Sequence, residues 1–111
     1  MKNWYEPLKQ RYSSFPGHVQ VLNMVSDLEK AASARGKGMH AWQNNLLRAI
    51  ILLDYIINDP KWDHALHELL RLRDAICSII AGIDYGTIEQ VIQAALLLDP
   101  AAYNAVKRKH A

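Results

Sequence analysis

The chain is poor in cysteine, glycine and proline, and each shortage excludes a class of structure. Cys77 is the single cysteine among 111 residues, so no disulfide can form within the chain. A chain without internal disulfides is typical of a reducing compartment, and we expect a cytoplasmic location. The five glycines and four prolines fall mostly between segments of regular hydrophobic pattern, where they separate helices.

The chain also lacks a hydrophobic segment long enough to cross a membrane. Its longest apolar run, residues 46–57, is interrupted by Arg48 and Asp54. It is also shorter than the roughly 20 residues that a membrane-spanning helix needs. The first twelve residues have no apolar core of the kind found in a signal peptide. We therefore predict a protein without a membrane partner.

Motifs of catalysis and nucleotide binding are missing as well. The sequence contains no G-x-S-x-G, no phosphate-binding loop and no G-x-G-x-x-G. His64, His67 and Glu68 could in principle bind a metal, as part of a metal-dependent enzyme. Their spacing matches no zinc motif with a known mechanism, however, and they fall on a helix face that should be solvated. We predict no enzyme, no metal and no cofactor.

A long apolar stretch, residues 39–58, dominates what remains. Half of all residues are hydrophobic and 22% are charged, which is typical of a folded globular protein. On a helix, residues 39–58 are apolar round most of the circumference, so several neighbours must cover them. Hydrophobic spacing and helix-boundary residues predict helices over residues 3–13, 18–34, 39–58, 60–81, from Thr87 onward, and 100–109.

These elements predict an all-α fold. We expect one domain, residues 1–111, built as a bundle of four to five antiparallel helices plus a short N-terminal helix. Trp4, Tyr5 and Tyr12 either pin the N-terminal helix onto the bundle or, with the basic residues beside them, stack on nucleic-acid bases.

Several apolar residues occupy positions where the helix pattern is polar. Leu47, Ile51 and Tyr55 form a row inside the polar arc of the central helix, and Leu97 is surrounded by polar residues in the helix after Thr87. Such residues often mark an interface, unless another segment of the chain covers them. Conversely, Asn45 is polar on the apolar arc, where it either bonds to backbone or sets the register of a helix–helix interface.

Basic residues suggest an anion-binding alternative. Arg73 falls within an apolar helix face, so it pairs with an internal carboxylate, such as Asp54 or Glu89, extends its charged end to the edge of the helix face, or meets a partner. The other candidates for binding an anion or nucleic acid lie in a loop and at the end of the last helix: Arg35, Lys37, Lys107, Arg108 and Lys109.

The net charge of +2 permits nucleic acid as a partner without requiring it. We therefore predict a non-catalytic protein–protein interaction module that associates with itself, as a homodimer or other homo-oligomer, or with another protein of a larger assembly. The alternative is a nucleic-acid-binding accessory subunit of a ribonucleoprotein or of a DNA-processing complex.

Overall fold

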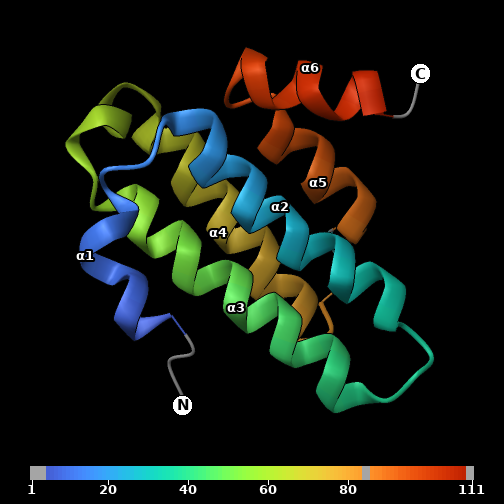
Figure 1. Ribbon diagram of the computed structural model, residues 1–111. Coiled ribbons are helices and arrows are strands. Elements are labelled where there is room, and N and C mark those ends of the chain that lie inside the picture. The colour runs from blue at the N-terminus through green and yellow to red at the C-terminus, as the bar shows by residue number, and fades with distance from the viewer. Residues whose placement is uncertain (1–4, 84–85, 110–111) are drawn as a thin grey trace.

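The computed structural model describes residues 5–83 and 86–109, and every regular element in these ranges is helical. The all-α prediction is thus confirmed (Figure 1). In chain order the elements are η1 (Glu6–Leu8), α1 (Lys9–Tyr12), α2 (Gly17–Ala34), α3 (Met39–Ile57), η2 (Pro60–Ala65), α4 (Leu66–Ile80), α5 (Ile88–Leu96) and α6 (Pro100–Lys109).

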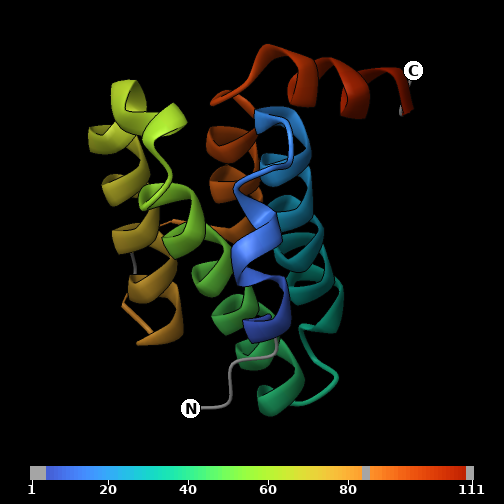
Figure 2. The same ribbon diagram turned by 60° about the vertical axis from the view of Figure 1, so that its left-hand side comes forward.

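Four consecutive helices, α2 to α5, run antiparallel to their neighbours and close into a ring. α2 packs against α3 and α5, and α4 packs against the same two helices. The most extensive of these contacts joins α2 to α3. The last helix, α6, crosses the end of the bundle over α2 and α5, while α1 lies beside α3 (Figures 1 and 2).

The core lies between these four helices, and α3 is buried as widely as its composition predicts. Its buried side chains are Leu46, Ala49, Ile50, Ile51, Leu52, Leu53 and Ile56. The facing stripe of α2 comprises Val21, Met24, Val25, Leu28 and Ala31. Removing one such leucine side chain would lower the free energy of unfolding by about 2–5 kcal/mol, because the space it leaves cannot fully close.

Local signals account for where several helices begin and end. Thr87 caps α5 in a complete capping box with Gln90, as predicted. Asp59 caps η2 by accepting a hydrogen bond from the backbone N–H of Lys61. Gly36, just beyond α2, has a φ of 82°, which glycine adopts without strain.

Two predicted helices differ in detail from the structure. The segment 60–81 begins as the 3₁₀-helix η2 and becomes α-helical only at Leu66. The segment predicted over 3–13 is a 3₁₀ turn followed by the single turn α1, and Trp4 lies outside the described residues. Hydrophobic spacing does not separate 3₁₀ from α winding over so few residues, because an apolar residue every third position satisfies both.

Gln20 is the centre of a buried polar network that the sequence pattern did not indicate. Its amide nitrogen donates to the backbone oxygen of Tyr12 at 2.8 Å and to Asp59 Oδ2 at 3.0 Å. Its amide oxygen accepts a hydrogen bond from Trp62 Nε1 at 2.7 Å. The Tyr12 hydroxyl donates in turn to the backbone oxygen of Gln20. One side chain of α2 thus joins the N-terminal segment to η2.

Two more contacts hold the N-terminal segment on the bundle. Lys61 Nζ donates to the backbone oxygens of Ser13 and Phe15, at 2.9 and 2.7 Å. The Tyr5 hydroxyl donates to Asp27 Oδ2, a buried carboxylate of α2, at 2.6 Å. In the structure Tyr5 and Tyr12 therefore attach this segment to the core, the first of their two predicted roles.

Candidate functional site: an apolar groove between α4 and α5

A groove of about 470 Å³ opens on the surface between α4 and α5. Its volume falls within the range of sites that hold ligands or partner side chains, roughly 300–1,000 Å³. The described residues that line it are Glu68, Arg71, Leu72, Ala75, Ile79, Gly86, Thr87, Gln90, Val91, Ala94, Leu97 and Leu98.

Small side chains explain why the groove is open. Ala75 on α4 and Ala94 on α5 both line it, and so does Gly86 just before α5. α4 packs more extensively on α3 than on α5, and α5 packs more extensively on α2 than on α4. The alanine side chains on the facing sides of α4 and α5 are too short to fill the space between these helices.

Leu97 lies at the C-terminal end of α5 and lines the groove while remaining 71% exposed. Among the large apolar residues of the described chain it is the most exposed. Burying a leucine side chain fully against a partner is worth about 1.5–3 kcal/mol. An exposed leucine beside an apolar groove is therefore the arrangement expected where a second surface docks.

The charged residues of the groove belong to one helix. Glu68 and Arg71 both line it, three positions apart on α4, and both are exposed. Neither forms an ion pair with any residue in the ranges 5–83 and 86–109. The two charges are thus available to a partner.

The row predicted from the central helix is largely covered within the chain. Ile51 is only 5% exposed, and Leu47 and Tyr55 are half-buried. The ring of Tyr55 contacts that of Tyr12, with centroids 5.9 Å apart, and α1 lies beside α3 in both ribbon views (Figures 1 and 2). The N-terminal segment thus contacts this row at Tyr55, and Leu97 is the member of the predicted interface set that is exposed.

Asn45 and Arg73, the polar exceptions on apolar arcs, both have partners inside the chain. Asn45 Nδ2 donates to the backbone oxygen of Ala41 at 2.9 Å. Arg73 Nε donates to Asp54 Oδ1 at 2.7 Å, and both side chains of this pair are partly exposed. The hydrogen bond from Arg73 to Asp54 and the carboxylate charge raise the pKa of the guanidinium. Of the two predicted mates of Arg73, Asp54 is the one that the structure places there.

The other basic residues do not gather into one patch. Arg35 follows the C-terminal end of α2 and pairs with Glu89 of α5. Lys107 and Arg108 are exposed on α6, which begins beside the opposite end of α2, where Asp99 lies near Gly17. The 18 residues of α2 span about 27 Å, and Figures 1 and 2 show α6 and the loop containing Lys37 at opposite ends of the bundle. The side chain of Lys109 lies outside the described residues.

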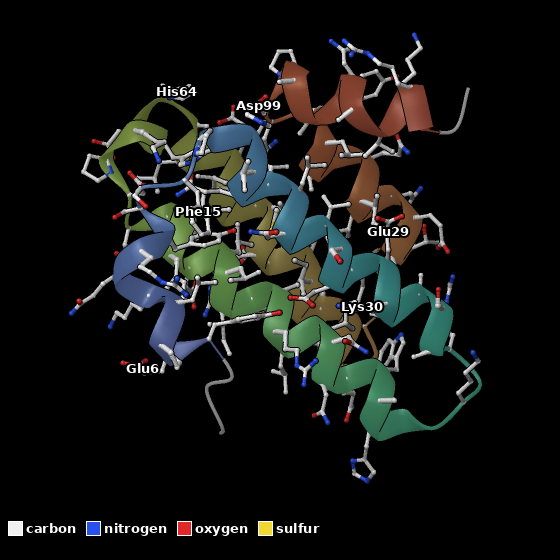
Figure 3. The ribbon with its side chains drawn as sticks, in the orientation of Figure 1. Glu6, Phe15, Glu29, Lys30, His64 and Asp99 are labelled. Carbon is white, nitrogen blue, oxygen red and sulfur yellow. The ribbon has the colours of Figure 1, made fainter. Side chains whose placement is uncertain are left out.

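The two histidines considered above as metal ligands are both exposed. His64 is exposed in η2, stacked on the ring of Trp62 and directed outward at one end of the bundle (Figure 3), and His67 is exposed on α4. Across the described residues, no three histidine, cysteine or acidic side chains come close enough to hold a metal ion.

None of the helices in the ranges 5–83 and 86–109 is long and apolar enough to cross a membrane.

The fold and the groove define the class to which the chain belongs, an all-α antiparallel bundle with an open apolar surface site. The chain matches no protein-family model, no curated protein and no solved structure.

Proposed function

We propose that the protein is a non-catalytic protein–protein interaction module and that its partner docks in the α4/α5 groove. The observation that carries this proposal is Leu97, a large apolar side chain held 71% exposed beside an apolar groove. Partner binding would cover Leu97 together with the apolar floor, including Leu72 and Val91. A contact of this kind derives its free energy from removing apolar surface from water.

The chemistry of the groove favours binding over catalysis. Among its described lining residues the charged groups are Glu68 and Arg71, and both are exposed rather than buried. Catalytic acids and bases are usually tuned by burial and by close charged neighbours inside a cleft. The single cysteine supports our further proposal that the module works in a reducing compartment such as the cytoplasm.

Nucleic-acid binding stays the alternative proposal. It is supported by the mild basic charge of the chain and by the exposed Lys107 and Arg108 on α6. Arg35 and Arg73 contribute less to it, because each is paired with a carboxylate of the chain.

Site-specific photo-cross-linking tests the docking proposal. The photoreactive residue p-benzoylphenylalanine is introduced at Leu97 in the full chain, and irradiation is carried out in the native host. The matched control carries the same residue at Leu70, an exposed leucine on α4 that does not line the groove. We expect discrete protein adducts from position 97 and far fewer from position 70. Absence of adducts at 97, or equal yields at the two positions, would overturn the proposal.

A further inference from the structure

The charges beside the groove are arranged so that they complement a second copy of themselves. Glu68 and Arg71 have opposite sign and lie three positions apart on α4, which places them on neighbouring turns of the same helix face. If a second α4 packs antiparallel across this face, with a two-fold axis between positions 68 and 71, each glutamate faces the arginine of the other copy. A two-fold contact of this type pairs residue i with j and j with i.

We propose that the occupant of the groove is a second copy of this chain, which forms an isologous dimer. The α4 helices pack antiparallel, and Glu68 of each copy pairs with Arg71 of the partner subunit. This inference rests on the proposed function, because it names the partner that docks at the same groove.

The apolar part of the site fits the same symmetry. Leu97 lines the groove together with Leu72 and Leu98, so a two-fold contact contributes each of these side chains twice. The burial of Leu97 supplies free energy, and the two charge pairs fix the orientation of the subunits. A partner helix bearing charges of one sign would satisfy either Glu68 or Arg71 and repel the other.

The size of the α4 contact surface indicates how tightly the two copies should associate. The 15 residues of α4 extend about 22 Å, so the contact is small compared with a permanent dimer interface. The charge pairs are exposed and individually weak. We therefore expect reversible dimerisation, with a Kd in the micromolar range or above, and strengthening at low ionic strength.

Charge exchange provides a test that a change in folding cannot imitate. Glu68→Arg makes both positions basic, and Arg71→Glu makes both acidic, so each variant alone places like charges opposite each other. Mixed together, the two variants restore two opposite-charge pairs in a heterodimer. Sedimentation equilibrium of untagged protein, over roughly 1 µM to 1 mM, measures all of these associations.

We expect each single variant to self-associate at least tenfold more weakly than wild type. The mixture should recover a Kd within about threefold of wild type, and so should the double variant Glu68→Arg/Arg71→Glu. Asp74→Arg is the matched control, since it makes the same type of charge change on the same helix, at an exposed position outside the groove. It should leave association unchanged.

Three results would overturn the second-copy proposal: a wild-type protein that stays monomeric over this range, single variants that dimerise normally, or a mixture that does not recover. The cross-linking experiment at position 97 shows whether only the second-copy proposal fails or the docking proposal fails as well. Adducts with a different protein overturn only the second copy as occupant. If position 97 yields no adduct, both proposals are overturned.

Discussion

Replacing Gln20 with alanine should be among the most destabilising single substitutions in this chain. The Gln20 side chain is fully buried and bonds to three groups that are themselves buried, on Tyr12, Asp59 and Trp62. Alanine would remove this partner from all three groups. The Tyr12 backbone oxygen would keep the bond from the Phe15 N–H, and Asp59 Oδ2 would keep Lys61 Nζ at 3.2 Å, whereas the buried indole N–H of Trp62 would lose its partner. Each such loss lowers stability by about 1–2 kcal/mol.

Together these losses predict that the free energy of unfolding falls by about 3–6 kcal/mol, a large part of the 5–15 kcal/mol typical of a domain. The assay is equilibrium unfolding in urea, followed by circular dichroism at constant pH. Gln93→Ala is the control, because Gln93 is exposed on α5 and its loss should change stability by less than about 0.5 kcal/mol. A loss below about 1 kcal/mol for Gln20→Ala would refute the view that this network holds the N-terminal segment to η2.

Three further predictions concern ionisable groups. Burial alone would raise the pKa of the Asp59 carboxyl, but hydrogen bonds from Gln20 and Lys61 outweigh it and lower the pKa. The Asp59 carboxylate therefore stabilises the fold at pH values above its pKa in the unfolded chain, near 4, and this stabilisation is lost as the pH falls through its lower pKa in the folded protein. In the Asp59→Asn variant, the free energy of unfolding should therefore fall less steeply at acid pH than in wild type. Burial raises the pKa of the Asp27 carboxyl despite the hydrogen bond from Tyr5. The charged carboxylate therefore lowers the free energy of unfolding at pH values above its pKa in the unfolded chain, and this loss disappears when the carboxyl is protonated in acid. Tyr5→Phe should thus lower the free energy of unfolding by about 1–2 kcal/mol at pH 7 and by less in acid, and an equal loss at both pH values would contradict this reasoning. Reversing the charges at positions 107–109 should weaken any binding to nucleic acid and flatten its salt dependence, and no measurable binding by the wild type at low salt would end the nucleic-acid alternative.

Features that depend on residues close together in the sequence could be predicted from the sequence alone. The helix class follows from hydrophobic spacing, and the start of α5 follows from Thr87 and Gln90, which lie three positions apart. Gly36 marks the end of α2 because glycine accepts the positive φ found there. Leu97 was identifiable in the same way, as an apolar residue on a polar helix face.

Features that join distant segments were not predictable. Gln20 lies 39 positions from Asp59 and 42 from Trp62, and no local pattern connects them. The groove depends on how α4 and α5 pack on each other and on α2 and α3, and Ala75 and Ala94 look like ordinary helix residues until that packing is known. Likewise, the contact of Tyr55 with Tyr12 depends on the position of the N-terminal segment, which the periodicity of α3 does not encode.

The most direct test of docking at the α4/α5 groove is a native mass spectrum of untagged protein, gently purified from its own host, for wild type, Leu97→Glu and Leu70→Glu. If a partner docks at this groove, the wild type forms a complex with the mass of an added protein chain, and this complex is lost in Leu97→Glu and retained in Leu70→Glu. At protein concentrations above the expected Kd, a bare monomer for the wild type, or a complex that survives Leu97→Glu unchanged, would contradict docking at the groove.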